Sequence, residues 1–257
     1  MNYVPMLPKR VKLTFLLTGL SLILFQSCKK DENTKNDTTN NSSTSANKIM
    51  PLGASRVQGN RPDYESFRYD LWKDLTTAGW DFDFIGNMQD NASYPTFQNL
   101  TFDNDHEGRG GWTSGEILDG LEDWLDQTGP VDIVLFSSPA GNDALQGLPY
   151  NQAIVNINGI IDVLQADNPN VTIVIEQMAP GHSSIMTQNL TNLLDQLKLD
   201  LVTISSDQTT STSSVIVVDM FTGFTDAMLA DDVHYNEIGA EFIATRYFNV
   251  LSPILQD

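Results

Sequence analysis

Short apolar runs rich in β-branched residues alternate with longer stretches of helical periodicity along most of this chain, and this alternation limits the folds open to it. Five runs have the length and composition of buried strands, namely Lys48–Leu52, Phe82–Ile85, Asp132–Phe136, Val171–Glu176 and Val215–Asp219. Apolar residues recur three and four positions apart in Tyr64–Ala78, Ser114–Gln127, Asn151–Ala166, Met186–Ser205 and Asn236–Leu251. Strands joined by helices form parallel sheets that are covered on both faces. The sequence therefore predicts an α/β fold, a three-layer α/β/α sandwich around a five-stranded parallel sheet.

The N-terminal residues have the composition of an export signal. Three basic residues precede the apolar run Leu13–Phe25, which is too short to cross a bilayer comfortably. The only cysteine of the chain, Cys28, follows this run, and the residues around it resemble the lipobox of bacterial lipoproteins. We expect residues 1–28 to be a lipoprotein signal peptide, with Cys28 lipidated and the protein anchored in the bacterial cell envelope, at the outer membrane or the cell surface. A secreted protein cleaved near Ser27 is the alternative.

Residues 29–47 contain no large apolar side chain, so we expect a disordered tether. The remaining residues, 48–257, have the length of one domain. This region contains 8 Lys and Arg against 30 Asp and Glu, a formal charge of −22. Such a surface repels phosphate backbones and anionic lipid. We therefore expect neutral substrates, no nucleic-acid partner, and membrane contact only through the lipid anchor.

A serine follows the first predicted strand at the point where the strand breaks. The stretch Lys48–Arg56 runs from apolar residues into Gly53, and Ser55 comes two positions later. Open α/β sheets bind their ligands at the carboxyl ends of parallel strands. Ser55 is therefore a candidate nucleophile, although a glycine and a serine after an apolar run also suit an ordinary turn.

The long segment Met88–Thr113 contains several glycines next to acidic residues. Gly111 and its neighbours could bring backbone N–H groups close to a ligand, as an oxyanion hole requires. A surface loop without function is the alternative. Asp103–Gly108 also fits the first half of a calcium loop, but the twelfth position is Ser114 instead of glutamate. We do not expect an EF-hand, and we assign no metal and no cofactor.

Two further groups of polar residues follow later strands. Asn142 comes after the third strand, and its amide could donate to a developing oxyanion. Asp231 and His234 precede the last helix, at a spacing that lets one turn supply both a base and the carboxylate that orients it. Each signal is weak by itself, since an Asn-Asp pair also caps helices and Asp-x-x-His is common. Their order along the chain is more informative than any one of them.

In that order these residues resemble the four sequence blocks of the SGNH/GDSL hydrolases. Ser55 lies in the first block, Gly111 in the second, Asn142 in the third, and Asp231 with His234 in the last. Several longer segments resemble the acetyl xylan esterases of carbohydrate esterase family 3, namely KIMPLG, YESFRYDLW, DFDFIGN and above all FDNDHEGRGGWTSGEI. The resemblance extends from Lys48 to about Ile254. It implies the flavodoxin-like sheet of that superfamily.

Two positions depart from the pattern of the superfamily. Ala54 stands where the first block usually has aspartate, and Ala140 stands where the third block usually has glycine. Neither change removes a member of the catalytic triad. Both could alter the turns that position it, so loss of activity is a real alternative.

The resemblance implies a serine esterase that removes acyl groups, with acetyl as the expected group, from polysaccharide. Ser55 would attack the ester, His234 would take its proton, and Asp231 would orient the imidazole. The backbone amides of Ser55 and Gly111 and the side chain of Asn142 would form the oxyanion hole. Two alternatives stay open: a lipid or thioester hydrolase, which needs an apolar groove for an acyl chain, and an inactive glycan-binding lipoprotein.

Overall fold

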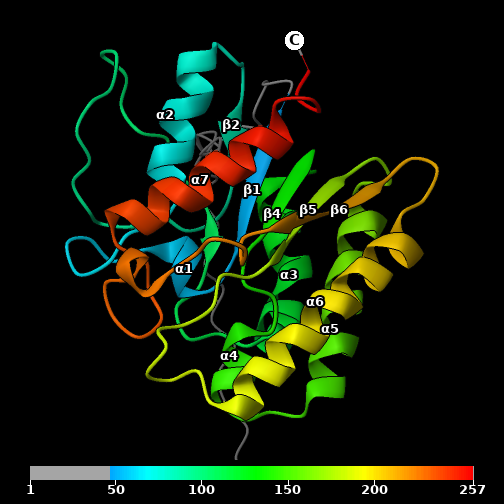
Figure 1. The fold of residues 1–257 in the computed structure, drawn as a ribbon. Helices are drawn as coiled ribbons and strands as arrows, with labels where there is room; N and C mark the ends of the chain where they lie inside the picture. The colour runs from blue at the N-terminus through cyan, green and yellow to red at the C-terminus, as the bar shows by residue number, and fades with distance from the viewer. Residues whose placement is uncertain (1–46, 257) are drawn as a thin grey trace, which may run out of the picture. The chain divides into compact units, whose positions relative to one another are not determined.

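A computed structural model of the chain describes residues 47–256 (Figure 1). The strands of this region are β1 Lys48–Gly53, β2 Asp83–Phe84, β3 Glu107–Gly108, β4 Ile133–Phe136, β5 Thr172–Gln177 and β6 Ser214–Asp219. The helices are α1 Ser55–Gln58, α2 Arg68–Ala78, α3 Ser114–Thr128, α4 Gly141–Leu145, α5 Tyr150–Asp167, α6 Gln188–Gln208, the 3-10 helix η1 Asp226–Met228 and α7 Glu237–Leu251. The strands and helices therefore alternate, as the sequence predicts.

All the strands pair in parallel and form one sheet in the order β2-β1-β4-β5-β6. This is the flavodoxin-like order, in which the direction of winding changes between the first strand and its later neighbour. The short strand β3 also pairs with β1, through Leu52 with Glu107 and Gly53 with Gly108. The predicted α/β fold class is confirmed, with β3 as a sixth strand beyond the predicted five.

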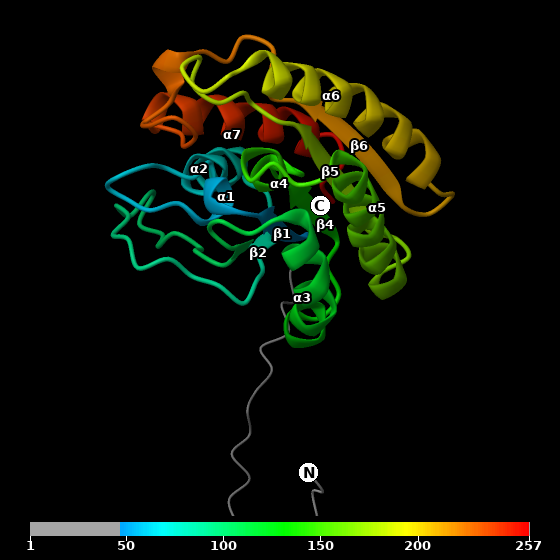
Figure 2. The same ribbon diagram turned by 90° about the horizontal axis from the view of Figure 1, so that it is seen from below.

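Helices cover both faces of the sheet, and each face has its own apolar core. Met50, Val134 and Ile173 point to the face covered by α3, α5 and α6. Ile49, Ile133 and Val174 point to the face covered by α2 and α7. Adjacent residues thus face opposite layers, as the pleat of a strand requires. Figure 2 shows α3 and α5 on one side of β1 and β4, with α2 and α7 on the other.

The ends of the long helices follow from local sequence. Thr113 and Glu116 form a capping box at the start of α3, since the Thr113 side chain accepts from the Glu116 amide and Glu116 accepts from the Thr113 amide. At the end of α2, Gly79 adopts a left-handed conformation with φ 81°. The short helices α1 and α4 have no apolar repeat of their own. Sequence periodicity therefore did not predict them.

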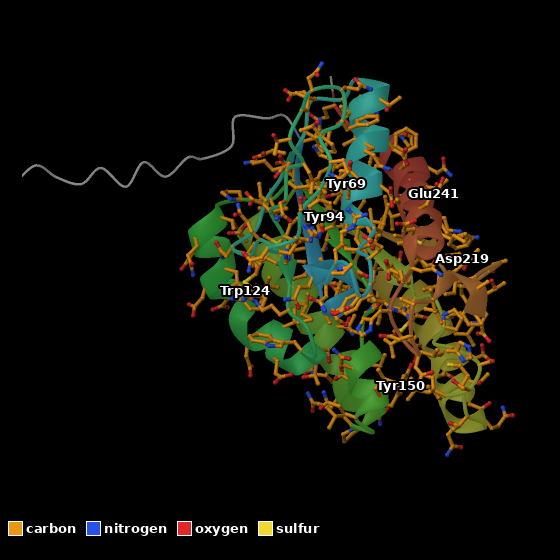
Figure 3. The ribbon with its side chains drawn as sticks, turned by 90° about the vertical axis from the view of Figure 1, so that its left-hand side faces the viewer. Tyr69, Tyr94, Trp124, Tyr150, Asp219 and Glu241 are labelled. Carbon is orange, nitrogen blue, oxygen red and sulfur yellow. The ribbon has the colours of Figure 1, made fainter. Side chains whose placement is uncertain are left out.

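The segment between β2 and α3 is packed against α2, which argues against a surface loop without defined structure. The side chain of Arg68, which has no solvent exposure, donates to the backbone oxygens of Gln58 and Asn104 and forms an ion pair with Asp90 at 2.6 Å. Tyr69 of α2 lies beside Tyr94 of the segment, with 5.1 Å between ring centroids (Figure 3). One buried cation therefore fastens this segment to the start of the domain.

The predicted signal peptide, Cys28 and most of the predicted tether lie outside the described residues. Asn47, which the sequence assigns to the end of the tether, is 2% exposed and packs against the domain. Its side chain donates to the backbone oxygens of Asp81 and Gln256 and accepts from the Gln256 amide. The packed region thus begins before Lys48. Within residues 47–256, no helix is long and apolar enough to cross a membrane.

Asn47→Ala should destabilise the domain, because it removes three partly buried hydrogen bonds that hold both ends of the described chain together. We expect the free energy of unfolding in urea to fall by about 1–3 kcal/mol. The control is Asn170→Ala at an exposed position, which should change it by less than about 0.5 kcal/mol. Equal stability of the two variants would contradict a structural role for Asn47.

Candidate active site

Ser55 lies directly beyond the carboxyl end of β1, as the first residue of α1. A close backbone approach fixes this turn, since a Cβ added to Gly53 would lie 2.8 Å from the backbone oxygen of Ser137. Only glycine fits there without a shift. Ala54 occupies the N-cap position of α1 and provides no side-chain cap. An aspartate at this position, usual in the first block, is a residue type that caps helices well.

Ser55, His234 and Asp231 form a hydrogen-bonded series. The Nε2 atom of His234 lies 2.8 Å from the Oγ of Ser55, and its Nδ1 atom lies 2.7 Å from the Oδ2 of Asp231. The other carboxylate oxygen of Asp231 accepts from the backbone amides of Val233 and His234, both at 2.7 Å. Partial burial acts to raise the pKa of Asp231, but these hydrogen bonds outweigh it and lower the pKa. The carboxylate therefore remains ionised opposite the imidazole.

An aromatic ring covers one face of the imidazole. The ring of Tyr64 stacks on His234 with centroids 3.9 Å apart and an angle of 15° between the planes. Tyr64 is held there because the neighbouring amide of Glu65 donates to the backbone oxygen of Tyr235. The apolar pattern predicted a helix from Tyr64 and no role for its ring, whereas α2 begins at Arg68. The segment that carries Tyr64 lies far from His234 in sequence, so no local pattern indicated the contact.

Asn142 and the glycines face the site from α4 and from the segment before α3. The Nδ2 atom of Asn142 donates to the backbone oxygen of Trp112 at 2.7 Å, which fixes the amide and leaves its second N–H group for another acceptor. Gly111 has φ 82°, and a Cβ there would meet nothing within 4 Å. Gly110 lies beside Ser55, since a Cβ on it would be 3.9 Å from that of Ser55, and its amide donates to Gln58.

The loop between β4 and α4, just before Asn142, contains two residues in the left-handed region, Ser138 with φ 50° and Ala140 with φ 59°. Such conformations are unfavourable for residues other than glycine and persist where neighbours impose them. The carboxylate of Glu176 is fully buried and accepts from the Ser138 amide at 2.7 Å and the Ser137 hydroxyl at 3.1 Å. These bonds hold the loop in its strained form.

Arg56, the residue after the candidate nucleophile, joins the loops around the site. Its guanidinium donates to the backbone oxygens of Val233 at 2.9 Å, Ala179 at 2.7 Å and Pro180 at 3.2 Å, and it lies over the ring of Tyr235. It is 5% exposed. No role was predicted for Arg56 from the sequence. The sequence did offer one signal for Arg56. It is a basic residue next to the candidate nucleophile, in a domain with few basic residues.

The acidic segment considered as a calcium loop uses its side chains for internal bonds. Asp103 accepts from the amide of Phe84, and Asp105 accepts from Gln89. Burial raises the pKa of Asp103 to about 7, although the bond from Phe84 acts to lower it. His106 accepts from the amide of Gly108, and burial lowers its pKa to about 2. Among residues 47–256, no three His, Cys, Asp or Glu side chains are arranged to hold a metal ion.

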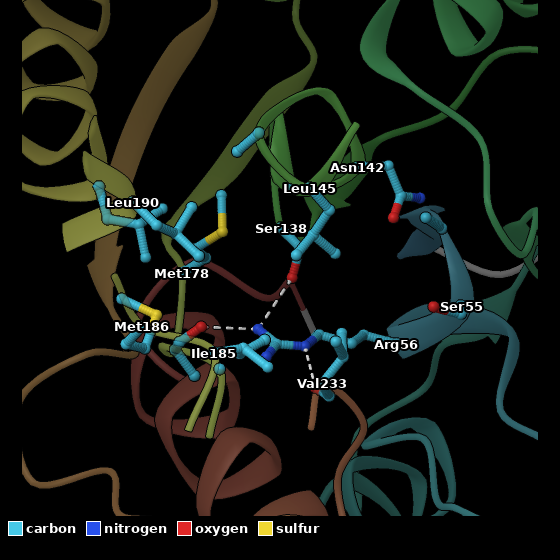
Figure 4. Close-up of a pocket in the computed structure, with 16 residues that line it drawn as sticks. Ser55, Arg56, Ser138, Asn142, Leu145, Met178, Ile185, Met186, Leu190 and Val233 are labelled. Carbon is cyan, nitrogen blue, oxygen red and sulfur yellow. Dashed lines mark hydrogen bonds between the residues drawn. The ribbon is translucent and has the colours of Figure 1, made fainter. Parts of the chain in front are cut away.

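Ser55 and Asn142 line one cavity, together with apolar residues from α4, α6 and the loop between β5 and α6 (Figure 4). The structure thus brings together the candidate nucleophile, the histidine, its carboxylate and the candidate amide donor, which come from three separate parts of the chain. Gly111 lies in the turn before Trp112, whose backbone oxygen binds Asn142. Its assignment to the oxyanion hole stays a prediction, as do the catalytic roles of the other residues.

Comparison with known proteins gives matches among solved structures alone. No protein-family model matches the chain, and no curated protein matches it. The structure of a serine-to-alanine variant of an acetyl esterase with an acetate ion has a TM-score of 0.69 and 28% identity, covering 81% of this chain and 97% of that chain. A carbohydrate esterase family 3 protein from Talaromyces cellulolyticus gives the same values.

A more distant structure shares the fold. A member of the lipolytic protein G-D-S-L family from Veillonella parvula DSM 2008 has a TM-score of 0.58 and 17% identity, covering 80% of this chain and 99% of that chain. At this identity the likeness concerns the fold alone. The two more similar structures are also covered almost completely, so the resemblance to family 3 seen in the sequence extends through the domain.

Ala140→Gly should stabilise the domain. Glycine removes the strain of a left-handed alanine, about 1–2 kcal/mol, and this exceeds the entropy that glycine adds to the unfolded chain. We expect the free energy of unfolding in urea to rise by about 0.5–1 kcal/mol. The control is Ala153→Gly, equally buried but in the right-handed helix α5, which should lower it by about 1 kcal/mol or more. A similar loss in both variants would show that Ala140 is not strained.

Proposed function

We propose that this chain is a serine esterase of the SGNH/GDSL hydrolase superfamily that removes acyl groups, acetyl among them, from polysaccharide. The observation that carries the proposal is the hydrogen-bonded series of Ser55, His234 and Asp231. The likeness to an acetyl esterase and to a family 3 carbohydrate esterase supports the ester bond and the acetyl group. The strongly acidic domain supports a neutral substrate.

In the proposed reaction Ser55 attacks the ester carbonyl carbon while His234 removes the proton from its hydroxyl. The bond between Oγ and the acyl carbon forms, the bond to the alcohol oxygen breaks, and His234 returns the proton to the departing alcohol. Asp231 holds the imidazole in the tautomer that presents an unprotonated Nε2 to Ser55. Tyr64, stacked on the same ring, limits its rotation. Water then attacks the acyl-enzyme by the same route, which releases the acid and restores Ser55.

The negative charge of the tetrahedral intermediate requires donors opposite His234. We assign this role to the backbone amides of Ser55 and Gly111 and to the second N–H group of Asn142. The bond from Asn142 to Trp112 supports the assignment, because it orients the amide before substrate arrives. Every step of this mechanism is carried by side chains, backbone amides and water.

Substitutions at the proposed catalytic residues should lower kcat by different factors. We expect Ser55→Ala and His234→Ala each to lower kcat by several orders of magnitude, and the double variant to be little worse, because the two residues act as one unit. Asp231→Asn should cost less, and Asn142→Ala should cost on the order of 10²-fold. The measurement is kcat for acetate release from acetylated xylan by the full-length protein. Ser206→Ala, at an exposed position of α6, is the matched control and should be unchanged.

The same assay separates the alternatives. A Ser55→Ala protein that is folded and keeps its activity would refute the mechanism. An inactive wild type that gains turnover with Ala54→Asp would be a degenerate enzyme with an intact catalytic arrangement. An inactive wild type that binds the polysaccharide and gains nothing from Ala54→Asp would be a glycan-binding protein.

We also propose that the protein is lipid-anchored through Cys28, as the composition of residues 1–28 suggests. Once the signal is cleaved, the acyl chains on the cysteine would be the anchor. The Cys28→Ala variant should therefore be absent from the membrane fraction of bacterial cells, whereas the control variant Ser43→Ala should remain in that fraction. Equal retention of both variants on immunoblots of the fractions would exclude this anchor.

A further inference from the structure

We propose that the cavity beside Ser55 is an acyl pocket that prefers a saturated acyl group of about four or five carbons to acetyl. This inference rests on the proposed function, because it concerns the acyl side of the same ester. Figure 4 shows the cavity extending from Ser55 and Asn142 to Met178, Met186 and Leu190.

The position of the cavity relative to His234 indicates that the cavity holds the acyl group of the ester. His234 must return its proton to the alcohol oxygen, so the alcohol leaves on the side of Ser55 where the imidazole lies. The cavity is lined by Ser55 and Asn142 but not by His234. A carbonyl carbon bonded to Ser55, with its oxygen towards Asn142, therefore directs its remaining substituent, the acyl chain, into the cavity.

The lining of the cavity suits an uncharged hydrocarbon chain. Six of the lining side chains are large and apolar, namely Leu145, Met178, Ile185, Met186, Leu190 and Leu194. The only charged side chain is Arg56, and its guanidinium donates to three backbone oxygens. Sugar hydroxyls in such a cavity would lose their hydrogen bonds to water without replacement. The sugar is therefore expected on the side of His234.

The size of the cavity exceeds what acetyl requires. About 50 Å³ is open to the centres of water-sized molecules. At roughly 10–15 Å³ for each such centre, this holds three to five methylene-sized groups. Acetyl would place a single methyl there and leave the rest unfilled. Met178 and Met186 have flexible side chains that can adjust to a chain of this length.

The experiment compares 4-nitrophenyl acetate, butanoate, hexanoate and octanoate as substrates of the full-length protein. We expect kcat/KM to rise by about threefold for each methylene from acetate to butanoate, because each is removed from water, and to fall again at octanoate. A kcat/KM that declines steadily with chain length from acetate onward would overturn the inference and leave the esterase proposal intact. No turnover that depends on Ser55 with any ester would refute the proposed function and this inference with it.

Two variants at one position test whether this cavity sets the preference. Leu190→Trp should fill it and lower the ratio of butanoate to acetate kcat/KM by about tenfold, whereas Leu190→Ala should enlarge it and move the optimum to hexanoate. Leu199→Trp is the matched control, since Leu199 lies on the same helix, is 65% exposed and does not line the cavity. It should keep the wild-type ratio. Leu190 variants that change all esters by one common factor would also overturn the inference.

Discussion

The buried carboxylate of Glu176 is the interaction on which the rest of the site depends. It has no solvent exposure and lies at the end of β5, where it accepts from Ser138, Ser137 and the Tyr247 hydroxyl. Burial raises its pKa, while these donors and the nearby Arg56 act to lower it. A buried carboxylate is costly unless several donors satisfy it. The loop that provides the donors is thereby fixed, including the strained Ala140 that precedes Asn142.

Arg56 connects the loop after β4 to the loop that carries His234. Because it follows Ser55 directly and binds the backbone oxygen of Val233, one side chain couples the position of Ser55 to that of His234. Its other bonds, to Ala179 and Pro180, hold the loop that forms one wall of the cavity. The arrangement of Ser55 and His234 and the shape of the cavity therefore depend on the same guanidinium.

The topology explains why these contacts gather at one place. The strand order reverses between β1 and β4, and the loops that follow these two strands diverge to opposite faces of the sheet. Ser55 follows β1, and Asn142 follows β4, so the two side chains line one cavity where the loops separate. β3, only two residues long, pairs with β1 and brings the glycines of the next segment to the same edge. Figure 1 shows α1 and α4 at this end of the sheet.

The sequence by itself determined the order and type of the main strands and helices, because apolar periodicity depends on neighbours in the chain. It also indicated that Ser55 and Asn142 share an edge, since both follow parallel strands and parallel strands end together, and that Asp231 and His234 lie in one turn. Only the tertiary structure decided that Tyr64 covers the imidazole, that Arg56 and Glu176 hold the loops, and that the cavity is apolar. These features rest on contacts between distant parts of the chain; even Ser55 and His234 are 179 residues apart. The short elements α1, α4 and β3 were missed for the same reason, since contacts with the sheet and its loops stabilise them and they have no periodic pattern of their own.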